Sequence, residues 1–139
     1  MGLPGSGKTT LSRELAYHFN VPHINADVVR EAYNNWDFSM EGRAEQAYRM
    51  TKFPFGILDF VCPRTFFRNI VNPDIIIYMD TIEKSRYKDT NDIFQPPTSG
   101  IRITEWIPHD QLLSSLEGFN PGTAGILSYL NGPFLKLVK

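Results

Sequence analysis

The sequence predicts an α/β fold, in which a parallel β-sheet is covered by α-helices. Three observations support this prediction. A glycine-rich segment, residues 2–9, leads into an amphipathic helix over residues 10–19. A continuous apolar run, residues 75–79, has the composition of a strand that is buried on both faces. Strand-like and helix-like segments alternate along the chain, which is typical of parallel sheets with right-handed crossovers.

The early elements follow from local signals. Asn20 is suited to end the first helix in the left-handed conformation. Residues 21–25 are short and extended, as expected of a strand. A helix over residues 27–34 follows, opened by Asn25 or Asp27.

The next helix has both a start and a stop signal. Ser39 can cap it, and Pro54 stops it after about Phe53. Its apolar stripe consists of Met40, Ala44, Ala47 and Met50. Gly56 then leads into a candidate buried strand over residues 57–61.

The later elements continue the alternation. We expect helices over residues 64–70, 81–88 and 108–116, a loop over 91–100 and a strand over 101–105. Ligands in such sheets lie beyond the carboxyl ends of the strands. The glycine-rich segment, residues 25–27, residues 62–68 and Asp80 are therefore expected along one rim.

Composition and charge restrict the function classes. The 139 residues carry 14 basic and 15 acidic side chains, which argues against a dedicated nucleic-acid or membrane-surface binder. A single cysteine, Cys62, and the lack of a signal-peptide pattern indicate the cytoplasm. Residues 1–117 are expected to form one domain. Residues 118–139 are linker-like and either pack back on the sheet or lead into a missing domain. A homodimer or a fused second domain is thus a candidate partner.

The glycine-rich segment matches the phosphate-binding pattern G-x-x-x-x-G-K-[ST] in full. Glycines allow the backbone N–H groups to converge on an anion, and the helix that follows adds its positive dipole end. In this pattern Lys8 reaches the β- and γ-phosphates of ATP, and Thr9 offers its hydroxyl to Mg²⁺. The expected phosphate-binding residues are Gly2, Pro4, Gly5, Ser6, Gly7, Lys8, Thr9 and Thr10. A surface loop rich in glycine, serine and proline is the alternative.

A loop of this kind follows a buried parallel strand, but only Met1 precedes Gly2. We therefore expect the first strand to be missing from this sequence. The chain would be a fragment, begin at an internal methionine or borrow a strand from elsewhere. The neighbouring strand would then have unpaired backbone groups, either exposed or covered by another segment.

Two pairs of residues are candidates for acceptor chemistry. Asp27 and Arg30 lie three residues apart after a strand end, so they are neighbours on a helix. Asp27 can accept a proton or orient a Mg²⁺-bound water, and Arg30 can hold an anion. A capping carboxylate beside a solvated arginine explains the spacing equally well. Phe38 can stack on a base and Arg43 can bind phosphate or sulfate, or they are a packed ring and a surface cation.

Other candidates carry weaker signals. Basic residues can form a lid that neutralises charge during phosphoryl transfer, or merely a solvated face. They are Arg64, Arg68, Lys84, Arg86 and Lys88. Cys62 precedes Pro63 without an identifiable base partner, so we expect a buried or rim thiol. His18, His23 and His109 lack metal-ligand spacing and are interpreted as structural or surface residues.

Together these segments resemble adenylylsulfate (APS) kinase over residues 2–94. Residues 25–30 read Asn-Ala-Asp-Val-Val-Arg where the family has Asp-Gly-Asp-x-x-Arg, and residues 38–43 begin Phe-Ser and end in Arg, as the family does. Residues 61–63, Val-Cys-Pro, stand where the family has Ile-Ser-Pro. The resemblance implies a P-loop NTPase fold of the nucleoside-monophosphate-kinase-like type, with three αβα layers.

The resemblance also implies roles. Lys8 and Asp27 would be catalytic, and Thr9 and Asp27 would bind or order Mg²⁺. The acceptor pocket would comprise Asp27, Arg30, Phe38, Arg43, Gln46, Cys62 and Pro63. The lid would contain Arg86, Lys88 and Asn91.

Departures from the family concentrate in the acceptor half of the site. Asn25 replaces the first Asp, Gln46 replaces an Asn that contacts substrate, Cys62 replaces a Ser, and Asn91 replaces a Lys. We expect an ATP- and Mg²⁺-dependent kinase acting on a hydroxyl of APS or a similar small anionic acceptor. The alternatives are a kinase for a sugar, nucleoside or polynucleotide end, and a nucleotide-binding module that regulates a missing partner domain.

Overall fold

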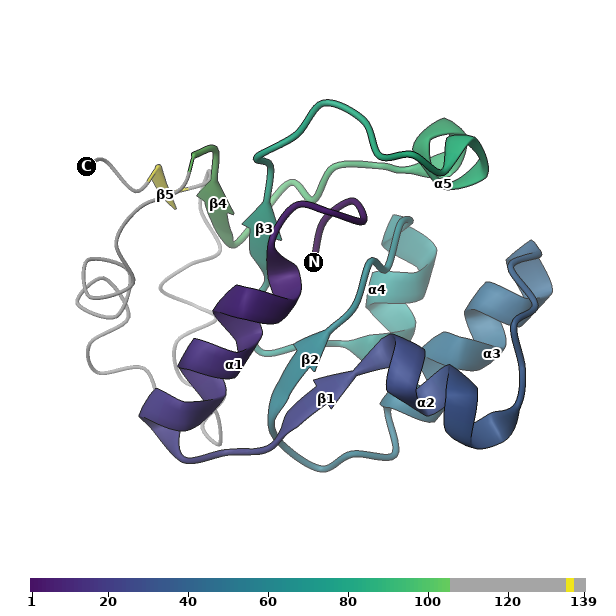
Figure 1. The fold of residues 1–139 in the computed structure, drawn as a ribbon, viewed down its shortest axis with the longest axis horizontal. Helices are drawn as coiled ribbons and strands as arrows, with labels where there is room; N and C mark the ends of the chain where they lie inside the picture. The colour runs from purple at the N-terminus through teal and green to yellow at the C-terminus, as the bar shows by residue number, and fades with distance from the viewer. Residues whose placement is uncertain (106–134, 137–139) are drawn as a thin grey trace.

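The computed structural model describes residues 1–105 and the backbone of residues 135–136. Helices and strands alternate through the described chain (Figure 1). In order they are α1 (Lys8–Phe19), β1 (His23–Asn25), α2 (Ala26–Tyr33), α3 (Met40–Met50), β2 (Ile57–Asp59), α4 (Thr65–Val71), β3 (Ile77–Met79), α5 (Lys88–Ile93), β4 (Ile101–Ile103) and β5 (Leu135–Lys136).

All strand pairs are parallel, and the sheet is divided into two parts. β1 pairs with β2, and β3, β4 and β5 form the second part in that order. The expected extension of residues 118–139 lies outside the described residues, except that β5 packs back on the sheet beside β4. The predicted helix over residues 108–116 and His109 also lie outside the described residues.

The first two residues stand beside β3, at the junction between the two parts. The Met1 amino group donates to the Ile77 carbonyl at 2.7 Å, and the Met79 N–H donates to the Met1 carbonyl at 2.8 Å. Gly2 continues this as a parallel bridge to Met79. A Cβ at Gly2 would lie 2.6 Å from the Met79 carbonyl oxygen, so glycine is required here. Met1 and Gly2 therefore continue the parallel sheet beside β3.

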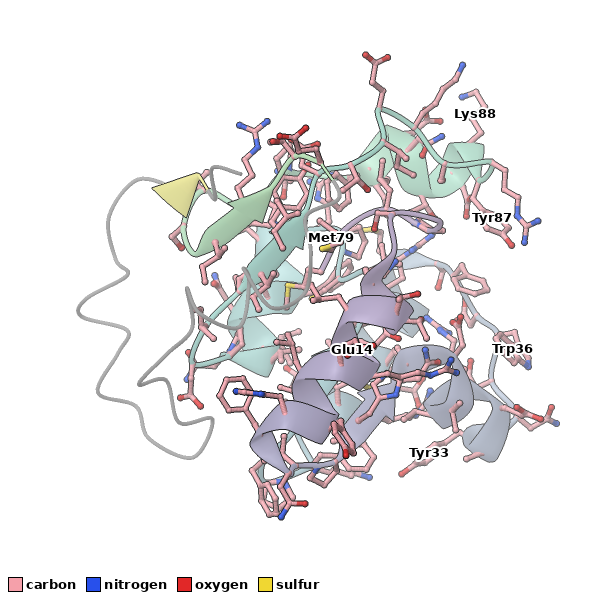
Figure 2. The ribbon with its side chains drawn as sticks, turned by 60° about the vertical axis from the view of Figure 1, so that its left-hand side comes forward. Glu14, Tyr33, Trp36, Met79, Tyr87 and Lys88 are labelled. Atoms are coloured by element: carbon pink, nitrogen blue, oxygen red, sulfur yellow. The ribbon has the colours of Figure 1, made fainter. Side chains whose placement is uncertain are left out.

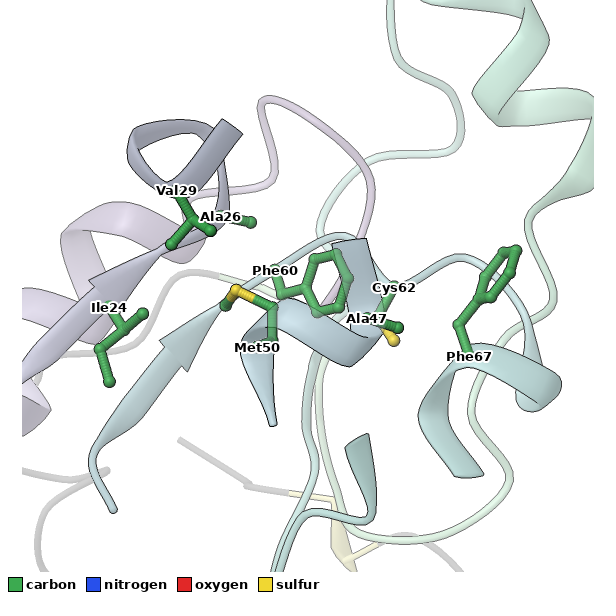
Figure 3. Close-up of a cluster of buried hydrophobic side chains, with 8 residues drawn as sticks. All are labelled: Ile24, Ala26, Val29, Ala47, Met50, Phe60, Cys62 and Phe67. Carbon is green, nitrogen blue, oxygen red and sulfur yellow. The ribbon is translucent and has the colours of Figure 1, made fainter. Parts of the chain in front are cut away.

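Each part of the sheet has its own hydrophobic cluster. α1 covers β3 and β4 through Leu11, Leu15, Met79, Ile101 and Ile103. The second cluster lies around β1, α2 and α3, and Figure 3 shows its members: Ile24, Ala26, Val29, Ala47, Met50, Phe60, Cys62 and Phe67. α3 packs between α2 and α4.

Three predicted elements need correction. The helix expected over residues 81–88 is wrong: residues 81–87 are not helical, and α5 instead occupies the start of the expected 91–100 loop. The reason is a side-chain contact across this turn. The Asn91 side chain accepts a hydrogen bond from the Ser85 N–H and donates one to the Ser85 carbonyl, so these backbone groups are not free for a helix. The strand over residues 57–61 ends at Asp59.

α3 also differs from its expected form. It ends at Met50 instead of Phe53, and Met40 of the expected apolar stripe is exposed. The buried side of α3 includes Arg43, Gln46 and Arg49, because it faces polar backbone groups of the neighbouring loop and of α2. Within the described residues, no helix is long and apolar enough to span a membrane.

Candidate active site

The phosphate-binding segment forms a tight loop between the Met1–Gly2 bridge and α1. Gly5 and Gly7 have φ values of 85° and 99°, which glycine adopts without strain. Gly7 caps α1 without a side-chain hydrogen bond, and the first turn of the helix holds no acidic residue. The N-terminal N–H groups and the helix dipole are therefore directed at an anion-sized space.

Two side chains of this loop have binding capacity left. The Lys8 ammonium donates to the Leu3 carbonyl at 3.0 Å, inside its own loop. Burial lowers the pKa of Lys8, and the nearby carboxylates of Asp59 and Asp27 oppose that shift. The buried Ser6 hydroxyl has no hydrogen-bond partner among the described residues. The Lys8 ammonium can turn from the Leu3 carbonyl to a phosphate oxygen, so the loop fits a bound phosphate.

A buried carboxylate lies directly behind the loop. Asp59, at the end of β2, is only 4 % exposed. Its Oδ2 accepts hydrogen bonds from the Thr9 hydroxyl at 2.6 Å and from Asn25 Nδ2 at 2.8 Å, and it lies 3.1 Å from His23 Nε2. Burial alone would raise the pKa of Asp59, but these hydrogen bonds and the charge of Lys8 outweigh it and lower the pKa. Asp59 is therefore ionised at neutral pH.

The groups around Thr9 fit a phosphate-bound Mg²⁺. This ion takes oxygen ligands and is commonly held by one or two carboxylates together with substrate phosphates and water. Thr9 and Asp59 supply a hydroxyl and a carboxylate in contact with each other. Asp27 lies exposed at the start of α2, where its N–H donates to the Asn25 side chain. No cluster of three or more His, Cys, Asp or Glu side chains suited to a metal occurs in the part of the chain described.

A cleft of about 810 Å³ extends from this loop across the rim of the sheet. Its floor contains Lys8, Thr9, Asp27 and Asp59, and its far wall contains Arg30, Phe38 and Arg43. The remaining wall is formed by residues 60–63 and 84–87. A volume of this size accommodates more than a triphosphate, so the cleft has room for an acceptor.

The two arginines of the far wall are buried and already occupied. Arg30 donates to the carbonyls of Asn35 and Asp37, and Arg43 donates to the carbonyl of Phe38. Arg43 also reaches Asp89 and Thr90 of α5, both at 3.2 Å. Both guanidinium groups lie over the Phe38 ring, at 4.3 and 5.3 Å from its centroid. They therefore hold the 35–38 loop and its aromatic residue in place.

Gln46 and Cys62 differ in their relation to the cleft. Gln46 is fully buried, donates to the Ala26 carbonyl at 2.8 Å and does not line the cleft. Cys62 lines the cleft beside Pro63 but is buried, and burial raises the pKa of its thiol to about 12. The thiol is therefore neutral at physiological pH.

The expected lid residues point in different directions. Arg86 lines the cleft and stacks on its neighbour Tyr87. Lys88 faces solvent and pairs with Asp92, as its position at the top of Figure 2 indicates. Asn91 holds the backbone of Ser85. Arg64 lies at the start of α4, and Arg68 is buried and donates to the Cys62 carbonyl, so neither joins the others.

Comparisons with known proteins agree on the fold. A family model described as an AAA domain matches residues 1–60. A solved structure of the APS kinase CysC from Mycobacterium tuberculosis, a cysteine-to-alanine mutant, superposes with a TM-score of 0.62 at 18 % sequence identity. The match covers 84 % of this chain and 90 % of that one. No curated protein matches the sequence.

The chain has the P-loop NTPase fold. Its parallel strands with flanking helices, its loop and its superposition all agree with the predicted fold class. The structural neighbour shows that the chain shares its fold with a protein named an APS kinase, the family that the motifs resemble.

Asp59 is the site residue that sequence reasoning missed. It was treated as part of an apolar strand, yet a carboxylate at the end of such a strand is itself the signal, since P-loop enzymes place an acidic residue there beside Mg²⁺. His23 was interpreted as structural or surface, and it contacts that carboxylate. Trp36 and Tyr87, which lie on the same edge of the molecule in Figure 2, also line the cleft and carried no sequence signal.

Proposed function

We propose that this chain is an ATP- and Mg²⁺-dependent kinase that transfers the γ-phosphoryl group to a hydroxyl of a small anionic acceptor, with APS as the first candidate. The observation that carries the proposal is the 2.6 Å hydrogen bond between Thr9 and Asp59 beside the P-loop. It joins the loop hydroxyl to an ionised carboxylate at the place where P-loop enzymes hold Mg²⁺.

Each residue then has a defined task. Lys8 moves from the Leu3 carbonyl to the β- and γ-phosphates, and the Gly5 to Thr9 amides bind phosphate oxygens. Mg²⁺, when bound by Thr9 and Asp59, supplies positive charge to the phosphates. Asp27 faces the cleft from the start of α2 and receives the proton of the acceptor hydroxyl. Positioning and electrostatics supply most of the catalysis.

An adenylylsulfate acceptor is supported by the far wall of the cleft. Phe38 offers a half-exposed ring, and the arginines behind it give this wall a positive potential. The purine of the acceptor can stack on the ring, while the phosphate and sulfate groups of the acceptor lie toward the guanidinium groups. The structural neighbour named an APS kinase supports the same acceptor.

A second acceptor class has its own supporting observation. Trp36, Phe38 and Tyr87 line the cleft and are 50, 46 and 44 % exposed. Lys84 and Arg86 also line the cleft, next to Tyr87. Several aromatic rings beside cations can bind successive bases of a single strand, which favours a nucleoside or polynucleotide hydroxyl. Under this alternative the acceptor extends along the cleft beyond Phe38.

The test is a radiolabelled ATP transfer assay with a panel of acceptors: APS, nucleosides, a short 5′-hydroxyl oligonucleotide and sugars. We expect transfer to at least one nucleotide-like acceptor. In Asp27→Asn the rate of transfer should fall by roughly 10²-fold, which is the usual contribution of a positioned proton acceptor. ATP binding in that variant should persist. ATP binding without transfer to any acceptor would instead identify a regulatory nucleotide-binding module.

A further inference from the structure

Two residues that follow β3 contact the backbone of the phosphate-binding loop. The Thr81 hydroxyl donates to the Ser6 carbonyl at 2.7 Å, across 75 positions of the chain. The next residue, Ile82, packs against Gly5, because its Cδ1 lies 3.9 Å from the point where a Cβ on that glycine would stand. The mechanism proposed above gives neither Thr81 nor Ile82 a task.

The segment that carries Thr81 is itself fixed to β4. The N–H of the preceding residue, Asp80, donates to the Ile103 carbonyl at 2.8 Å. The Asp80 carboxylate accepts a hydrogen bond from Arg102 Nε at 2.8 Å and another from Nη2 of the same guanidinium group. Because both the backbone and the side chain of Asp80 are bonded to β4, Thr81 approaches the loop from a fixed position.

The hydrogen bond to Ser6 fixes the orientation of one peptide plane in the loop. The peptide between Ser6 and Gly7 is planar and trans, so the Gly7 N–H points away from the Ser6 carbonyl and hence away from Thr81. Gly7 is the N-cap of α1, and its N–H is one of the donors that the start of a helix leaves available to an anion. By holding the carbonyl on one side of this peptide, Thr81 therefore holds a phosphate donor on the opposite side.

The glycines of the loop make such a constraint necessary. Gly5 and Gly7 have positive φ values, and residues without a Cβ have access to many other backbone conformations. If the Ser6–Gly7 peptide rotated freely, its N–H would turn out of the site, and each binding event would include the cost of ordering it again. A hydrogen bond from a rigid neighbour removes this reorganisation and leaves the donor preorganised.

We propose that Thr81 is a positioning residue for nucleotide binding, which acts through the Ser6–Gly7 peptide to hold the Gly7 N–H in the direction of a bound phosphate. Thr81 does not line the cleft, so it acts without touching the ligand. The inference rests on the proposed function in one respect, since the loop has to bind the phosphates of ATP.

The test compares Thr81→Val, which keeps the shape of the side chain and removes the hydroxyl, with Thr81→Ser, which keeps the hydroxyl. In Thr81→Val the Kd for MgATP, measured by calorimetry, should rise roughly three- to tenfold, the value of one hydrogen bond, and in Thr81→Ser it should stay within about twofold of the wild type. Thr51→Val is the matched control, because the exposed Thr51 hydroxyl also donates to a backbone carbonyl, that of Tyr48, at 2.6 Å. Thr51 lies outside the cleft, so this variant should bind MgATP as the wild type does.

Amide NMR relaxation on the ligand-free chain tests the role of Thr81 separately from the kinase proposal. The order parameter of the Gly7 amide should be about 0.85 in the wild type, as for rigid backbone, and should fall toward about 0.6 in Thr81→Val. Thr81→Ala removes the same hydroxyl and replaces Thr81→Val if that variant does not fold.

Three results would overturn the inference. They are equal Gly7 order parameters in the wild type and Thr81→Val, a loss of MgATP affinity that Thr81→Ser does not restore, and a lower thermal midpoint of Thr81→Val with an unchanged Kd for MgATP. A wild-type chain that binds no MgATP would contradict the proposed function instead, and the relaxation measurement would then decide the role of Thr81.

Discussion

The two ends of the active-site cleft are built in opposite ways. At the phosphate end, the Lys8 ammonium bonds a carbonyl of its own loop, and the first turn of α1 carries no acidic residue. At the acceptor end, Arg30 and Arg43 are buried and bonded to backbone carbonyls and to α5. The phosphate end can therefore bind an anion directly, whereas the arginines of the acceptor end hold the loop that carries Phe38 in place. Substitutions should therefore affect chemistry at one end and substrate binding at the other.

The largest effect is expected at Lys8. Lys8→Ala removes the cation that would contact the transferring phosphates, and turnover should fall about 10³-fold, as for loss of a group that stabilises transition-state charge. The measurement is kcat at saturating ATP. Lys52→Ala, at an exposed lysine outside the cleft, is the matched control and should retain the activity. Equal turnover in wild type and Lys8→Ala would contradict the kinase proposal.

Asp59→Asn tests the carboxylate at the phosphate end of the cleft. The amide keeps the size of the side chain but removes the negative charge beside Thr9, so turnover should fall roughly 10²-fold and the Mg²⁺ requirement should rise. A titration of activity against Mg²⁺ measures both. Asp92→Asn, on the surface of α5, serves as the control. A normal Mg²⁺ midpoint in Asp59→Asn would assign the carboxylate a purely structural role.

Arg43→Ala tests the acceptor end. It removes hydrogen bonds to the Phe38 carbonyl and to α5, so the 35–38 loop and its ring should lose their fixed position. We expect KM for the acceptor to rise about tenfold, the value of one charge-assisted contact, while the Kd for ATP changes little. Steady-state kinetics and ATP titration separate the two. An equal loss of ATP affinity would show that the two ends are not independent.

Lys88→Ala should have the smallest effect. Its ammonium faces solvent and pairs with Asp92, and exposed pairs of this kind contribute little. Turnover, acceptor KM and the thermal midpoint should all match the wild type. A clear fall in turnover would bring Lys88 into the lid that the sequence suggested.

Local signals in the sequence were sufficient to predict part of the structure. The glycines that adopt positive φ, the capping of α2 by Asn25 and the capping of α3 by Ser39 depend on neighbours within a few residues. Such interactions form wherever the local pattern occurs, so the P-loop and the starts of these helices could be predicted.

Tertiary structure alone decided the rest, because the deciding contacts join residues far apart in the chain. Thr9 meets Asp59 across 50 positions, and Arg43 meets Thr90 across 47. The buried Gln46 side chain donates to the Ala26 carbonyl, 20 positions away. The sequence by itself determined that this protein carries a complete P-loop pattern at the start of a helix. Only the packing of α3 and α5 decided which side chains face the acceptor, since each partner is brought there by a different element.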